Sequence, residues 1–149
     1  MSDNINSLSL EQIADTLREV GFRATLATAN DRPLIQSAAQ GLGFIVTPGN
    51  RAADGSVAVF VDLTFSCLIQ VAGSMDAAGI ARWNEQKRFA RLYVADKTLV
   101  LAMDVFLATG DASRCLRGYC ELWDRVLNEF VAWLRSLSAA AAMAADATT

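Results

Sequence analysis

Residues 78–107 read AGIARWNEQKRFARLYVADKTLVLAMDVFL, and this stretch decides the fold class. It begins as a short helix that carries Trp83, and Asp76 just upstream can cap the free backbone N–H groups of that helix. A strand over residues 89–94, a turn at Asp96-Lys97 and a second strand over residues 98–107 follow. The second strand has an unbroken apolar face, so it is buried on at least one side.

A first helix is predicted over residues 10–20. Ser9 and Gln12 have the spacing of a capping box, in which each side chain accepts a hydrogen bond from the backbone N–H of the other residue. Apolar residues then recur on one stripe of the helix, and Gly21 supplies a left-handed stop. This segment therefore packs one face against a core.

Between the first helix and the deciding stretch, the apolar residues alternate with a period of two. This pattern predicts strands over residues 22–28, 34–39, 44–47 and 57–71, with turns at 30–33 and 48–50. Gly41 and Gly43 are expected to interrupt the early strands. The longest strand, over residues 57–71, would place Phe60 on the face opposite Leu63.

The last helix is expected to begin after Asp111. Large apolar residues, Trp123 among them, recur at steps of three and four as far as Leu137. Residues 138–149 are Ala-rich and lack an amphipathic stripe, so we expect a disordered tail after a single domain over residues 1–137. The order of elements predicts an α+β fold in which helices cover an antiparallel sheet.

The composition narrows the classes of function. The 149 residues are 53% apolar, which indicates a globular domain, and their net charge of −3 argues against broad electrostatic capture of nucleic acid. The chain has no His, so the commonest general base and metal ligand is missing. A polar N-terminus and interrupted apolar tracts predict neither a signal peptide nor a membrane span, and therefore a cytoplasmic protein.

The sequence contains no motif for a reaction or a cofactor. The Gly-Leu-Gly stretch at residues 41–43 lacks the rest of a phosphate-binding loop, and no Ser stands in a nucleophile-elbow pattern. Cys67, Cys115 and Cys120 fit no zinc spacing and are expected to be reduced, buried thiols. We therefore expect no enzyme, no cofactor and no metal site.

The order of a helix ending W-N-x-x-x-R-F, a strand, a short turn, an apolar strand with one Asp and a long helix resembles the YbjN family of bacteria. The residues that carry it are Trp83, Asn84, Arg88, Phe89, Tyr93, Leu101, Met103, Asp104 and Val105. The resemblance covers roughly residues 8–137. It implies a domain similar in fold to the type III secretion chaperones, which handles other proteins, often as a homodimer. It also implies a role in regulation or stress response.

Both residues of the W-N pair, Trp83 and Asn84, are candidates for partner binding. Trp83 could anchor a partner, but a Trp on an amphipathic helix is more often part of the core. Asn84 could bind a ligand, but a local hydrogen bond that fixes the helix-to-strand corner is the favoured interpretation.

A basic cluster follows, formed by Arg82, Lys87, Arg88 and Arg91. It offers an alternative function, a nucleic-acid-binding regulator that uses residues Arg82 to Arg91, although a solvated face or ion pairing within the chain is favoured. Asp104 lies in an apolar strand, and if it is buried it needs a partner, for which Arg88 or Arg91 is the candidate.

The second face of the predicted sheet holds Phe60 and Phe106 without an obvious cover. Proteins rarely leave a large apolar patch in water. The sequence therefore predicts a homodimer, or a monomer that captures a protein segment on this face. The candidate partner-binding residues are Phe60, Trp83, Asn84, Arg88 and Phe106.

Overall fold

The computed structural model describes residues 6–52, 57–71, 73, 75–108 and 110–147, with side chains as far as Leu137. The helices are α1 (Leu10–Glu19), α2 (Ala77–Gln86) and α3 (Ala112–Ala147). The strands are β1 (Leu8–Ser9), β2 (Thr25–Ala29), β3 (Arg32–Ala39), β4 (Leu42–Pro48), β5 (Val59–Phe60), β6 (Asp62–Gln70), β7 (Arg91–Ala95) and β8 (Thr98–Phe106).

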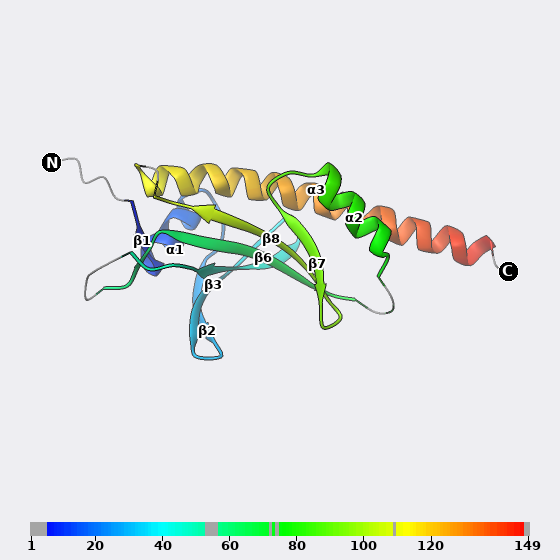
Figure 1. Cartoon of the computed structure of the whole chain (residues 1–149), viewed down its shortest axis with the longest axis horizontal. Helices are drawn as coiled ribbons and strands as arrows, with labels where there is room; N and C mark the ends of the chain where they lie inside the picture. Colours follow the sequence, from blue (N-terminus) through cyan, green and yellow to red (C-terminus); the bar gives the residue numbers. More distant parts are fainter. Residues whose placement is uncertain (1–5, 53–56, 72, 74, 109, 148–149) are drawn as a thin grey trace.

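An antiparallel sheet of six strands forms the centre of the fold, in the order β2-β3-β4-β6-β8-β7. A separate ribbon pairs β1 with β5. Figure 1 shows α3 running along the sheet, with α2 beside its second half. The predicted α+β fold with helices packed on an antiparallel sheet is confirmed.

The inner face of the sheet is the face that the helices cover, and its side chains are buried. They are Ile35, Phe44, Val46, Leu63, Phe65, Cys67, Leu92, Leu99, Leu101, Met103 and Val105. Trp123 of α3 is fully buried against this face, with ring centroids 5.7 Å from Phe44 and 5.4 Å from Phe65. The apolar stripe of the last helix thus packs against the alternate, inward-facing apolar side chains of the central strands.

The start of α1 has the predicted capping box. Gln12 N–H donates to Ser9 Oγ at 3.2 Å, and Ser9 N–H donates to Gln12 Oε1 at 2.9 Å. Gly21 has a φ of +98°, the left-handed conformation expected after the helix. These features follow from neighbouring residues alone, which is why the sequence predicts them well.

Three hairpins in the sheet turn through two residues that both have positive φ, as in type I′ turns. These pairs are Asn30-Asp31, Gln40-Gly41 and Asp96-Lys97. The predicted turn at 96–97 is confirmed. The predicted break at Gly41 is confirmed, because Gly41 lies in the tight turn between β3 and β4. The predicted break at Gly43 is wrong, because Gly43 lies within β4 opposite Ala38.

The predicted strand over residues 57–71 is also wrong at its first half, because the chain bends at Val61. Val61 N–H donates to Asn50 O at 2.9 Å, while Val61 O accepts from Leu107 N–H at 2.7 Å. The backbone of Asn50 also donates to the Asp62 carboxylate, at 2.6 Å. These bonds tie the bend to the end of β4, so β5 leaves the main sheet and pairs with β1.

The helix α3 continues through Ala147, and Figure 1 shows its last part extending beyond the sheet. Alanine has the highest helix propensity, so an Ala-rich segment can stay helical without a partner. The side chains from Ser138 onward lie outside those that the structure describes. The sequence predicts a disordered tail over residues 138–149, whereas the backbone of residues 138–147 is helical here. The end of the domain at residue 137 stays a prediction.

Replacing Trp123 with Ala should lower the free energy of unfolding by about 3–5 kcal/mol, because it empties the largest fully buried site in the core. Urea unfolding measures the change. Trp133, on the same helix, is only partly buried, so Trp133→Ala should cost less. Equal effects of the two substitutions would contradict the packing described here.

Deleting residues 139–149 should leave the melting temperature nearly unchanged, because this segment has no amphipathic stripe with which to bury apolar surface. Calorimetry on the shortened and full chains makes the comparison. A fall of more than a few degrees would show that the segment packs on the domain.

Candidate functional site

The helix-to-strand corner between α2 and β7 contains both residues of the W-N pair. Trp83 is only 2% exposed, and its ring meets Phe130 and Trp133 of α3 edge to face, at 5.7 and 5.9 Å between centroids. The core interpretation of Trp83 is confirmed, and its ring is not available as a surface anchor.

Asn84 joins the corner to the sheet by two hydrogen bonds. Its Nδ2 donates to Leu92 O at 2.8 Å, and its Oδ1 accepts from Leu92 N–H at 2.8 Å. β7 is an edge strand, so Leu92 would otherwise present both backbone groups without a neighbouring strand. The side chain of Asn84 takes the place of that neighbour, which confirms the local, structural interpretation.

Replacing Asn84 with Ala should destabilise the protein by about 1–3 kcal/mol, because both backbone groups of Leu92 lose their partner. Asn128→Ala at an exposed position of α3 is the matched control and should have little effect. The free energy of unfolding of each variant decides the matter. An unchanged value for Asn84→Ala would mean that solvent replaces the side chain without loss.

Three of the four residues in the basic cluster pair with carboxylates of the same chain. Arg82 lies 3.8 Å from Asp76, and Lys87 lies 3.6 Å from Glu129. Arg91 reaches Asp104 at 2.8 Å. Ion pairing within the chain, part of the favoured interpretation, is therefore confirmed for these three. Within the part of the chain that the structure describes, the fourth, Arg88, makes no ion pair.

The outer face of the sheet is the face opposite the helices. On its central strands it consists of Thr64, Ser66, Leu68, Arg91, Tyr93, Val100, Ala102, Asp104 and Phe106. Leu68, Val100 and Tyr93 stand side by side in register, with Leu68 50% and Tyr93 42% exposed. Phe106, at the end of β8, is 54% exposed. The outer face thus displays large apolar side chains.

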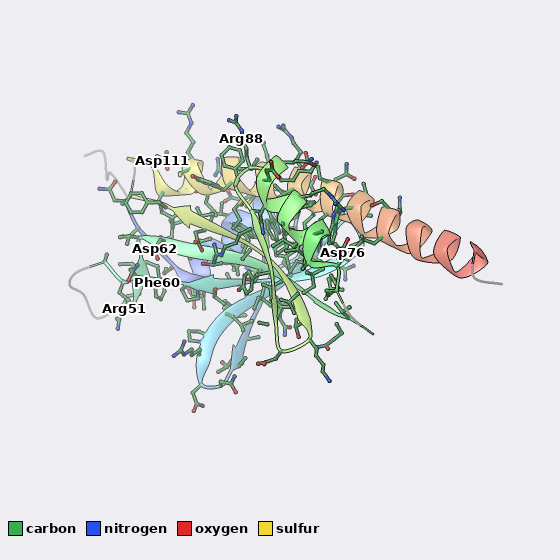
Figure 2. The ribbon with its side chains drawn as sticks, turned by 45° about the vertical axis from the view of Figure 1, so that its right-hand side comes forward. Arg51, Phe60, Asp62, Asp76, Arg88 and Asp111 are labelled. Atoms are coloured by element: carbon green, nitrogen blue, oxygen red, sulfur yellow. The ribbon has the colours of Figure 1, made fainter. Side chains whose placement is uncertain are left out.

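The predicted position of Phe106 on the second face of the sheet is confirmed, and the predicted position of Phe60 on that face is wrong. Partner binding by Phe106 stays a prediction. Phe60 pairs with Leu8 in the ribbon of β1 and β5 and is only 8% exposed. Figure 2 shows it near Arg51 and Asp62, at the end of the molecule where that ribbon lies. The bend at Val61 removes Phe60 from the main sheet, so it packs in the core instead of on the outer face.

A polar network crosses the middle of the outer face. Thr64 Oγ1 donates to Asp104 Oδ1 at 2.7 Å, and Arg91 Nη1 donates to Asp104 Oδ2 at 2.8 Å. The hydrogen bond from Thr64 is the main cause that lowers the pKa of Asp104; partial burial opposes it, and the hydrogen bond and charge of Arg91 lower the pKa further. The predicted partner Arg91 is confirmed, but Asp104 is exposed and not buried. An exposed ion pair of this kind adds little to stability.

The potential metal ligands and the thiols of the described residues lie apart from one another, with no cluster of three or more potential ligands among them. Cys67, Cys115 and Cys120 are free thiols, of which Cys67 and Cys120 are buried as expected, while Cys115 is only partly so. Burial raises the pKa of Cys67 to about 11, so its thiol stays protonated and is a poor nucleophile at neutral pH.

Two grooves were not foreseen from the sequence. One, of about 570 Å³, lies between the β2–β3 hairpin and β5, with Arg32 and Arg51 among its lining residues. The other, of about 310 Å³, lies between the segment after α2 and the middle of α3. Both depend on elements far apart in the chain, so no local pattern could have revealed them. None of the described helices is both long enough and apolar enough to span a membrane.

The fold defines a small α+β domain with large apolar side chains exposed on the sheet face opposite the helices. The chain belongs to the YbjN family, whose model matches residues 9–136 and is described as "putative bacterial sensory transduction regulator". This confirms the resemblance and places the chain in a family of regulators. No curated protein matches the sequence.

Proposed function

We propose that this chain is a non-enzymatic regulator that acts by binding protein, and that a second copy of the chain occupies the outer face. The observation that carries the proposal is the display of Leu68, Tyr93 and Phe106 on the sheet face that the helices do not cover. Exposed apolar patches of this kind mark interaction sites. Membership of a family described as regulators supports the regulatory part of the proposal.

The charges of the outer face favour a second copy as the occupant. Arg91 and Asp104 place both signs next to each other between apolar side chains. A contact between two copies related by a two-fold axis brings the same patch against itself, so each charge can meet the opposite charge of the partner. A patch of a single sign would repel its own copy.

The alternative function, a regulator that binds nucleic acid through Arg82 to Arg91, receives less support. Three of the four cations in this cluster are already paired, and the chain as a whole carries a net charge of −3. Phosphate contacts need free cations arranged along one surface.

The free thiols accord with the reducing cytoplasm that the sequence predicts.

Sedimentation at micromolar concentration should show a dimer of the wild-type chain. Phe106→Glu should give a folded monomer, because the carboxylate would be desolvated in the interface. Leu26→Glu, at another exposed apolar site, on β2, is the matched control and should remain a dimer. A monomeric wild type, or a dimer that survives Phe106→Glu, would refute the proposed interface.

A further inference from the structure

Phe89, in the segment between α2 and β7, is held in an unusual conformation and faces solvent. Its φ is +74°, and its side chain is 65% exposed. Ala90 N–H donates to Arg88 O at 2.9 Å, which closes a tight turn of three residues around Phe89. This is the rarer and more strained form of the γ-turn. A bulky residue with positive φ is a genuine outlier, and such strain gathers at binding sites.

The strained turn stands at a groove of about 310 Å³. We call this the Phe89 groove; its lining residues are Gln86, Lys87, Arg88, Phe89, Leu122, Arg125, Val126 and Glu129. Val126 is buried and Leu122 is partly buried, so apolar side chains of α3 form its floor. Phe89 adds a large exposed apolar surface beside that floor. The groove therefore suits an apolar side chain of a ligand.

Positive charge surrounds this apolar floor. Three cations and one carboxylate line the groove, and the carboxylate, Glu129, is paired with Lys87. Among the residues that the structure describes, Arg88 and Arg125 make no ion pair. Figure 2 places Arg88 at the rim of the molecule, next to α2 and α3. Two unpaired guanidinium groups thus flank an apolar floor on a protein whose net charge is −3.

We propose that the Phe89 groove binds an acidic segment of a partner protein. A large apolar side chain of that segment rests against Phe89 and Val126, and flanking carboxylates pair with Arg88 and Arg125. Arginine suits this role because its planar fork binds a carboxylate through two hydrogen bonds.

The extent of the positive charge favours a short acidic segment over nucleic acid. A nucleic acid carries its charges along its whole length and would extend past the groove over an acidic protein. An acidic protein segment can concentrate its carboxylates where Arg88 and Arg125 are. The apolar floor offers no hydrogen bond or charge to a phosphate backbone, whereas it can contact a leucine or phenylalanine side chain.

This groove is separate from the outer face. Its residues belong to α2, α3 and the segment between α2 and β7, on the helical side of the sheet. The proposal does not rest on dimer formation. Phe106→Glu alters only the outer face, so the two ideas fail or succeed independently.

The first test measures strain in the isolated chain. Asn adopts a positive φ at lower cost than Phe. If the side chain of Phe89 serves binding and not packing, Phe89→Asn should relieve the strain and raise the melting temperature by about 2–4 °C. Calorimetry on both proteins gives the shift. A fall in melting temperature would mean that Phe89 is a packing residue, and the proposal would be overturned.

The second test finds the ligand chemistry by selection. A random peptide library is selected on the wild-type protein and depleted on Phe89→Asn. Peptides that survive should combine Asp or Glu with one large apolar residue, and fluorescence anisotropy should show that their affinity falls with added salt. Enriched peptides that are basic or uncharged would overturn the proposal, as would the absence of peptides specific to the wild type.

Charge-reversal variants then place the selected peptide on the protein. Arg125→Glu should weaken its binding by at least about tenfold, since it turns an attraction into a repulsion. Arg114→Glu changes the same charge at an exposed site of α3 outside the groove and should leave the affinity unchanged. Equal losses in the two variants, or tighter binding of single-stranded DNA than of the peptide, would overturn the proposal.

Discussion

The register between β6 and β8 is the constraint on which the rest of the structure depends. Asp62 stands opposite Phe106 at one end of the pair, and Gln70 stands opposite Thr98 at the other. Because side chains alternate along a strand, this register puts one stripe of each strand under α3 and the other stripe on the outer face. A slip by one residue would expose the inner face and bury the Asp104 network. The core and the proposed dimer surface are thus two consequences of one pairing.

The corner after α2 links this sheet to the second surface. Trp83 fixes the helix in the core, and the two hydrogen bonds of Asn84 fix the edge strand β7 at Leu92. Only a few residues connect these two attachments, so the chain between them has little freedom. The tight turn that displays Phe89 lies in that short connection. The burial of Trp83 and the hydrogen bonds of Asn84 thus hold both ends of the segment in which Phe89 has a positive φ.

Electrostatics in this protein are local. The chain is acidic overall, yet most of its basic cluster is neutralised by neighbouring carboxylates, and these pairs are exposed and contribute little to stability. Their effect is on specificity. Pairing removes Arg82, Lys87 and Arg91 from general anion binding, and Arg88 and Arg125 remain as the cations at the Phe89 groove. A protein partner would therefore meet a small positive site and not a broad basic surface.

The sequence by itself determined the features that depend on neighbouring residues. The capping box of Ser9 and Gln12, the turn at Asp96-Lys97, the apolar stripe of the last helix and the family resemblance all follow from short-range patterns, and the structure agrees with them. Only the tertiary structure decided the rest. Phe60 is buried because a bend at Val61 sends β5 to another sheet, and Asp104 is exposed because the register of β8 places it on the face opposite the helices. The groove at Phe89 exists because α3, more than thirty residues further along the chain, supplies its floor. Such placements depend on contacts between distant segments, and no local pattern encodes which of those contacts the chain will make.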